Sequence, residues 1–182
     1  MRKIIVIICL LVAARTGTGA LWYSSGYNTF DDSDPYHAEV WVINDAVLDV
    51  FGGEMGKLEF QDNSSGNIYA SEMDWLWTDD NAVVNIYAAT FNMLASRPES
   101  TVYLYAYDVV YHSDGGYNDH PWLEGKYISG DTPFSFNFYY ESSVPQLHVV
   151  PEPATLILLA LGALVTRNQL HKASNYNIIE SR

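Results

Sequence analysis

Two glutamates at equivalent positions of a sequence repeat carry the side chains that glycoside hydrolysis would need. These residues, Glu54 and Glu72, stand one repeat apart. Glycosidases work with two carboxyl groups about 5–9.5 Å apart, and adjacent strands would place this pair about 4.8 Å apart. An exposed ladder of acids is the simpler interpretation in so acidic a chain. The sequence also has no nucleophile elbow, phosphate loop or His-Glu-x-x-His motif, so we predict no catalytic residues and no enzyme.

Histidine and aspartate side chains gather once, in a polar segment between two apolar stretches. His112, Asp114 and His120 are the one cluster between the two ends with the residue types of a metal site. Zinc ligands usually come in tighter pairs. We therefore interpret the cluster as a solvated loop and predict neither a bound metal nor a cofactor.

One column of aromatic residues is the strongest candidate for ligand binding. Its members recur once in each repeat and are Phe51, Tyr69, Tyr87 and Tyr105. On adjacent parallel strands the rings would follow one another at about 4.8 Å. Sugar rings stack on such platforms, and rings so placed also stabilise a sheet by packing on each other. Both interpretations of the ladder stay open.

The elements that position this column come from an 18-residue repeat. Units 44–61, 62–79, 80–97 and 98–115 align without gaps, and the second and third are identical at seven positions. Apolar columns flank the aromatic one: Val50, Ile68, Ile86 and Leu104 on one side, and the small residues Gly52, Ala70, Ala88 and Ala106 on the other. Alternation with a period of two predicts β-strands.

The repeat predicts an all-β fold, a short parallel β-solenoid of about four 18-residue rungs over residues 44–115. Like residues at a fixed interval would then stack into one core, with Ile68 above Ile86 and the small column against a wall too close for larger side chains. The alternative is an antiparallel β-sandwich, whose hairpins also recur every 8–12 residues. It does not account for the 18-residue interval.

Both ends of a solenoid need caps, because the end rungs expose backbone edges. Within residues 116–148, a strand–turn–strand pattern predicts a C-terminal β-hairpin, with Phe134, Phe136 and Phe138 on one apolar face. We assign residues 21–43 to an N-terminal cap.

Charge excludes one class of partner. Residues 21–150 hold three Lys or Arg against 20 Asp or Glu, a net charge of −17. Such a surface repels nucleic acid and anionic glycans, so we predict no nucleic-acid partner.

Residues 1–20 have the pattern of a secretory signal peptide. Arg2 and Lys3 precede an apolar stretch over residues 4–14, and small residues follow at 18–20. Cys9, the chain's one cysteine, lies inside this segment. We therefore expect export of a chain that no disulfide holds together.

The other end has a proline-flanked glutamate followed by an apolar stretch. Pro151, Glu152 and Pro153 precede an apolar segment at 154–166, and basic residues follow up to 172. As a helix, this apolar segment would be about 20 Å long, short of a bilayer core of about 30 Å. Residues 149–172 resemble a PEP-CTERM sorting signal, which implies processing by an exosortase-type enzyme at the bacterial membrane. Residues 173–182 form a polar tail.

The middle, over about residues 40–140, resembles exported PEP-CTERM proteins with short tandem units. The matching stretches are residues 52–58, 85–87 and 130–134. This resemblance implies no enzyme activity. We therefore expect a non-enzymatic protein of the cell surface or extracellular matrix, with extracellular polysaccharide as a candidate partner. A single C-terminal helix at 154–166 would serve as a transient or retained membrane anchor. The alternative is a carbohydrate-binding module that uses the aromatic ladder.

Overall fold

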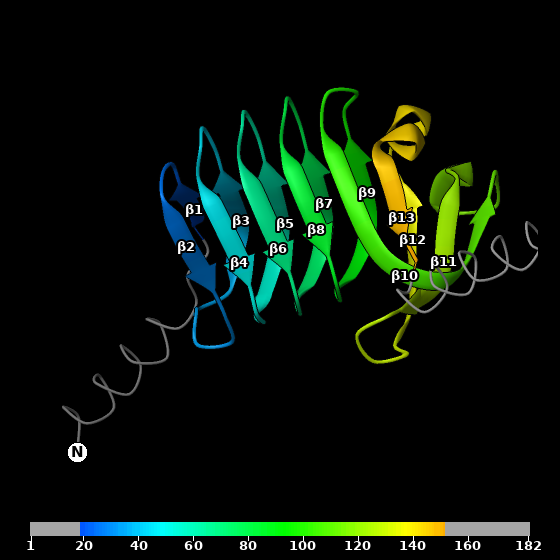
Figure 1. The fold of residues 1–182 in the computed structure, drawn as a ribbon, viewed down its shortest axis with the longest axis horizontal. Helices are drawn as coiled ribbons and strands as arrows, with labels where there is room; N and C mark the ends of the chain where they lie inside the picture. The colour runs from blue at the N-terminus through cyan, green and yellow to red at the C-terminus, as the bar shows by residue number, and fades with distance from the viewer. Residues whose placement is uncertain (1–18, 152–182) are drawn as a thin grey trace, which may run out of the picture. The chain divides into compact units, whose positions relative to one another are not determined.

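The computed structural model describes residues 19–151, and these form a parallel β-solenoid. Each of five successive turns contributes one strand to each of two sheets, and Figure 1 shows one sheet in front of the other. Sheet A contains β1 (Ala20–Tyr23), β3 (His37–Val42), β5 (Glu54–Phe60), β7 (Glu72–Thr78) and β9 (Thr90–Ser96). Sheet B contains β2 (Tyr27–Phe30), β4 (Val47–Val50), β6 (Ser65–Ile68), β8 (Val83–Ile86) and β10 (Thr101–His112).

The pairing register confirms the 18-residue rung. Ile68 pairs with Ile86 between β6 and β8, Val50 pairs with Ile68, and Ile86 pairs with Leu104, all between parallel strands. The same interval holds in sheet A from β3 to β9. Because equivalent residues of successive repeats are direct neighbours, the fold is the predicted solenoid and not the antiparallel sandwich.

The core lies between the two sheets and is built from stacked apolar columns. Sheet A supplies the buried residues Met55, Met73, Phe91, Leu58, Leu76 and Leu94, and sheet B supplies Leu48, Val84, Val102, Ile68, Ile86 and Leu104. Strand alternation turns these side chains inward at every second position. The rungs therefore share one continuous core.

The column of small residues is only partly in this core, contrary to the sequence prediction. Gly52 and Ala106 are buried, but Ala88 is half-buried and Ala70 is exposed. β6 ends at Ile68, and the chain bends over the next two residues. The alternation that would turn Ala70 inward stops there, so its side chain is exposed.

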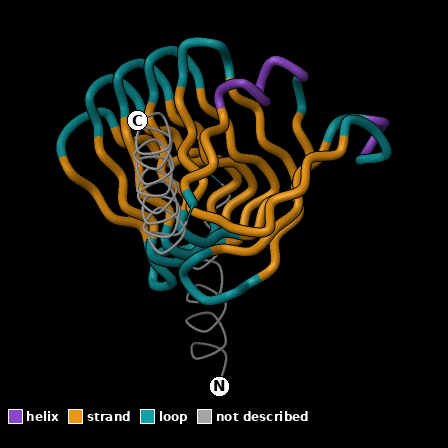
Figure 2. The backbone as a smooth tube through the Cα atoms, turned by 45° about the vertical axis from the view of Figure 1, so that its right-hand side comes forward, coloured by secondary structure: helices purple, strands orange, loops and turns teal. Residues whose placement is uncertain are grey.

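Polar ladders join the rungs at the turns between the sheets. Asn44, Asp62 and Asp80 occupy equivalent positions with φ of 58°, 59° and 50°, a left-handed conformation that Asn and Asp adopt more readily than other non-glycine residues. The backbone N–H of Asn44 donates to Oδ2 of Asp62 at 2.9 Å. The connecting loops of successive turns lie in a row in Figure 2. Each turn thus hydrogen-bonds to the next one.

The residues assigned to an N-terminal cap continue the stack. Residues 21–43 contain most of β1, together with β2 and β3, and all three pair in parallel with the following turn. Five turns therefore stand where the repeat predicts about four. The first turn is less regular, because Ala20 pairs with Glu39 and Tyr27 pairs with Val47, intervals slightly longer than one repeat.

A hairpin closes the C-terminal end, as predicted. β11 (Trp122–Tyr127) pairs antiparallel with both β10 and β12 (Pro133–Phe138), and β12 pairs in parallel with β9. The long strand β10 therefore leaves sheet B and joins the hairpin to it. Phe134, Phe136 and Phe138 are buried on the inner side of the cap.

The last strand returns to sheet B. η2 (Glu141–Gln146) leads into β13 (Leu147–Val150), which pairs in parallel with the first half of β10. The other short helix, η1 (Tyr117–Asp119), lies in the loop after β10. Across residues 19–151, no helix has the length and apolar character to cross a membrane. The predicted signal peptide, except its last two residues, and the predicted helix at 154–166 lie outside the described residues.

Candidate functional site

The predicted aromatic ladder forms on the outer side of sheet B. Ring centroids are 5.0 Å apart for Phe51 and Tyr69, 4.9 Å for Tyr69 and Tyr87, and 4.3 Å for Tyr87 and Tyr105. The planes of the first three rings differ by 4° and 5°. These distances are close to the strand spacing of about 4.8 Å. Each inner ring therefore has a neighbour over both faces.

This packing limits what the ladder can bind. A sugar stacks on an open ring face, and in the ladder those faces are covered by other rings. Phe51 has a ring partner on one side and is 50% exposed, so it is the member with the most open surface. The ladder stabilises sheet B by stacking, and ligand binding by it stays a prediction.

High pH should weaken the ladder. Burial and a hydrogen bond with Tyr105 raise the pKa of Tyr87 from 10.0 to about 12. The folded state therefore favours the neutral phenol, and the resulting stability is complete below pH 10 and is lost as pH rises towards 12. Tyr87→Phe keeps the stacked ring without the ionising group. Between about pH 9 and pH 11.5, we expect the thermal midpoint of Tyr87→Phe to fall less than that of the wild type. Equal falls in the two midpoints would contradict the assignment of this pH dependence to Tyr87.

The outer side of sheet A gathers tryptophans. Trp22 stacks on Trp41 with centroids 4.8 Å apart and planes 7° apart. Trp41, Glu59 and Trp77 are successive register partners on β3, β5 and β7. Because they alternate with the buried residues of the same strands, they face away from the core. Sheet A thus carries an aromatic outer surface of its own.

A lysine and a glutamate lie between these tryptophans. Lys57 Nζ is 2.6 Å from Glu59 Oε2, and it lies 4.2 Å from the centre of the Trp41 ring and 5.8 Å from that of Trp77. Glu59 is only 4% exposed. A cation over an aromatic face is attracted by the ring's quadrupole. Glu59 therefore balances most of the positive charge that Lys57 brings to this surface.

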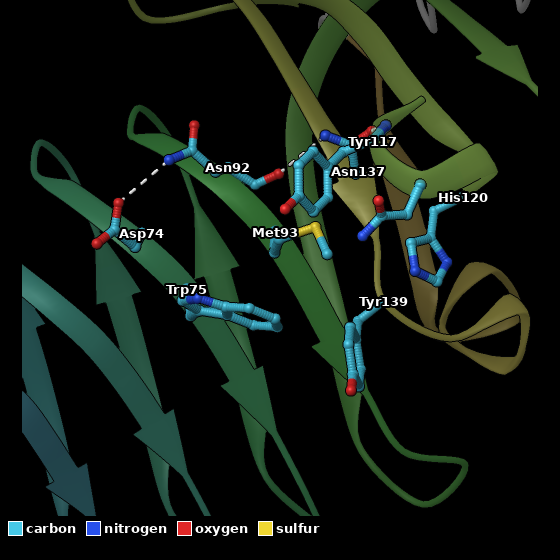
Figure 3. Close-up of a pocket in the computed structure, with 9 residues that line it drawn as sticks. Asp74, Trp75, Asn92, Met93, Tyr117, His120, Asn137 and Tyr139 are labelled. Atoms are coloured by element: carbon cyan, nitrogen blue, oxygen red, sulfur yellow. Dashed lines mark hydrogen bonds between the residues drawn. The ribbon is translucent and has the colours of Figure 1, made fainter. Parts of the chain in front are cut away.

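A pocket of about 580 Å³ opens beside Trp75, at the junction of sheet A and the C-terminal cap. Its walls come from β7, β9, β12, the residue after β12 and the η1 loop (Figure 3). The lining residues are Asp74, Trp75, Asn92, Met93, Tyr117, Asn118, His120, Asn137 and Tyr139. Its volume is within the range of about 300–1,000 Å³ that is typical of ligand pockets.

The rings of this pocket are not stacked face to face. Trp75 and Tyr139 meet at 70° with centroids 5.2 Å apart, and His120 and Tyr139 meet at 39° and 5.9 Å. Among the described residues no other ring lies against Trp75. Trp75 is half-buried, and its register partners on β5 and β9, Lys57 and Met93, are not aromatic.

Polar side chains surround the same pocket and are held in place by hydrogen bonds. Nδ2 of Asn92 donates to Oδ1 of Asp74 at 3.2 Å. Nδ2 of Asn137 donates to the Asn92 carbonyl at 3.3 Å, and the Tyr117 N–H donates to Oδ1 of Asn137 at 2.8 Å. Asn137 therefore fixes the η1 loop against sheet A. Figure 3 shows Asn92 and Asp74 across the pocket from Tyr139.

A second pocket of about 380 Å³ adjoins the first. The two share Asp74, Trp75 and Tyr139, so the Trp75 ring lies between them. The second is lined by Ala38, Glu39, Gly56, Lys57, Asp74, Trp75, Trp77 and Tyr139. We refer to the two pockets together as the sheet A groove.

The acidic pair and the histidines that the sequence singles out for chemistry lie at separate places in the fold. Glu54 and Glu72 are register partners and both are exposed at the start of their strands. Nε2 of His112 is 3.1 Å from Oε1 of Glu124, and the His112 ring stacks on Trp122 with centroids 3.8 Å apart. His120 lies in the groove instead. Within residues 19–151, no three His, Cys, Asp or Glu side chains could hold a metal ion together.

The candidate sorting residues follow β13 without a spacer. The strand ends at Val150, next to Pro151, and Glu152 and Pro153 lie beyond the described residues. Residues 149–167 match the PEP-CTERM protein-sorting motif. The predicted sorting signal at 149–172 is thereby confirmed over the matched stretch.

The PEP-CTERM motif fixes the broad biology of the chain. It implies export, a C-terminal sorting and anchor region, and processing by an exosortase, a membrane enzyme. Neither the curated proteins nor the solved structures include a match to the chain. The tail therefore implies the sorting route, and the role of the solenoid has to be argued from its surface.

Sequence reasoning did not find the groove. One signal was present, because Trp41 and Trp77 are two repeat lengths apart and share a column with Glu59. The ring contact between Trp75 and Tyr139 had no such signal in the sequence. Tyr139 lies outside the repeat and reaches sheet A because β12 pairs with β9.

Proposed function

We propose that this PEP-CTERM protein is a non-enzymatic component of the cell surface or extracellular matrix that associates with extracellular polysaccharide. The observation that carries the proposal is the sheet A groove, an aromatic and polar surface on an exported domain. Aromatic rings with open faces bind the C–H faces of sugars, and carboxylate and amide groups bind the hydroxyls. An acidic surface keeps such a protein soluble and away from polyanions.

The arrangement of acids supports a role without catalysis. A glycosidase needs two carboxyl groups on opposite sides of the scissile bond. Glu54 and Glu72 are register partners on neighbouring parallel strands, so both side chains extend from the same surface. The groove holds Asp74, whose Oδ1 accepts a hydrogen bond from Asn92. A binding surface accounts for these positions better than a cleavage site does.

A carbohydrate-binding module that works through the ladder is the second candidate. One observation favours it: Phe51 at the end of the stack is 50% exposed, and Tyr69 is 39% exposed. A sugar stacked on Phe51 would extend the ladder by one ring. The covered faces of Tyr69 and Tyr87 rank this candidate below the groove.

Co-fractionation tests the proposed function. The full chain is expressed in a host that has an exosortase and makes extracellular polysaccharide, and the purified polysaccharide is examined for the protein. We expect most of the exported protein in that fraction, and its release into the medium when polysaccharide synthesis is deleted. We also expect no reducing sugar to be released from the polysaccharide. Protein that distributes identically in both strains would contradict the association, and sugar release proportional to protein would contradict the non-enzymatic role.

A further inference from the structure

We propose that the sheet A groove binds a neutral glycan, with one sugar ring stacked on Trp75. The inference rests on the proposed association with polysaccharide and assigns it to one surface. Three properties of the groove carry it: aromatic side chains that line it, fixed polar groups beside them, and negative charge.

The apolar part of the groove has the form that a sugar ring requires. A pyranose has a face of C–H groups and a rim of hydroxyls. Trp75 and Tyr139 meet edge-on at 70°, and Met93, which is 6% exposed, lies among the residues that line the same pocket. Aromatic rings provide large contact areas with defined geometry. A sugar ring in this pocket would contact Trp75 and Tyr139, and no ring of the described residues stacks face to face on Trp75.

The polar groups are placed for hydroxyls. Asp74 and Asn92 are exposed, and their mutual hydrogen bond of 3.2 Å fixes both side chains beside the Trp75 ring. An aspartate oxygen accepts from sugar hydroxyls, and an amide both donates and accepts. Because Asn137 is held by the η1 loop and by Asn92, the rim is ordered before any ligand binds. Preorganised side chains lower the entropy cost of binding.

Charge selects among glycans. Asp74 and Glu39 line the groove, and Glu54 and Glu72 line a neighbouring pocket with Asp74. The one lysine in the groove, Lys57, is 2.6 Å from Glu59. Carboxylates on a glycan would meet like charge here without a free cation to offset it. The groove therefore favours sugars without acidic groups.

The groove also suits a chain better than a single sugar. The two adjoining pockets, of about 580 and 380 Å³, share Trp75, so a ligand on that ring has room on both sides of it. A polymer could pass over the ring with successive units in the two pockets. Binding should therefore strengthen with the number of sugar units before it levels off.

The test measures, by calorimetry, the binding of neutral gluco-, manno- and galacto-oligosaccharides and of oligouronates to the purified full chain. We expect binding of at least one neutral series, and weaker binding of oligouronates. Trp75→Ala should weaken that binding by about tenfold or more. Trp75→Phe should keep part of the affinity that Trp75→Ala loses. Asp74→Ala should also weaken binding while leaving the fold intact. Thermal melting of each variant controls for unfolding.

Phe51→Ala tests the rival site, since it removes the most exposed ring of the ladder on the other sheet. It should leave affinity unchanged. No binding of any neutral series, tighter binding of oligouronates, or equal affinity of wild type and Trp75→Ala would each overturn the inference. If Trp75→Ala still co-fractionates with the producing cells' polysaccharide and Phe51→Ala does not, the proposed association stands and the groove assignment fails.

Discussion

Gly66→Val should lower the free energy of unfolding by about 3 kcal/mol, the upper end of the cost of overpacking a core. A Cβ at Gly66 would overlap Cζ and Cε1 of Phe60 and would lie 3.1 Å from the Leu48 carbonyl oxygen. Phe60 is fully buried, so its ring cannot move aside into solvent. Valine is otherwise well suited to this position, because Val84 occupies it in the next rung.

A second substitution distinguishes this clash from a general intolerance of position 66. Phe60→Val alone should cost about 2–3 kcal/mol through the cavity that it leaves. In the double variant the new valine at 66 occupies part of that cavity, so the two costs should not add. We expect a coupling of about 2 kcal/mol in favour of the double variant, measured by denaturant unfolding. Additive costs would mean that Phe60 and Gly66 are not a size-matched pair.

Glu152→Ala should abolish processing of the tail while leaving export intact. The PEP-CTERM motif spans residues 149–167, and Glu152 is the charged residue between its two prolines. Mass spectrometry of wild-type protein from the cell surface should find a C-terminus near residue 153. In the variant, the full tail should remain and the protein should stay in the membrane fraction.

The solenoid itself provides the control for this experiment. Glu99→Ala removes an exposed acid far from the tail in sequence, in the turn before β10, and should be processed like the wild type. Mature wild-type surface protein that still ends at Arg182 would show that the motif is not used. A variant at Glu152 that is cut normally would show that this glutamate is not part of the recognised sequence.

The repeat made the register of the strands predictable. Ile68 and Ile86 are adjacent because one rung spans one repeat, and that interval is written in the spacing of like residues. The hairpin cap was also predictable, since Phe134, Phe136 and Phe138 alternate with other residues. Local patterns determine both features.

The features that were missed depend on where strands end and on pairs far apart in the chain. Ala70 was expected inside because the alternation was extended past Ile68, where the chain bends. The groove needs Trp75 beside Tyr139, and only the pairing of β12 with β9 brings the two together. The first turn of the solenoid was hidden because β1 and β2 pair with the next turn at intervals longer than the repeat.

The direct junction between β13 and the sorting motif has a mechanical consequence. Tension from the tail enters the fold at Val150, at the end of a strand that pairs in parallel with β10 along its whole length. A pull along that strand loads its hydrogen bonds together, in shear, instead of opening them one by one. If β13 does detach, β10 is still held by β8 and β11, so the break removes one strand and spares the stack. Before its tail is processed, the protein can thus be pulled at Val150 without losing the turns that carry its surface.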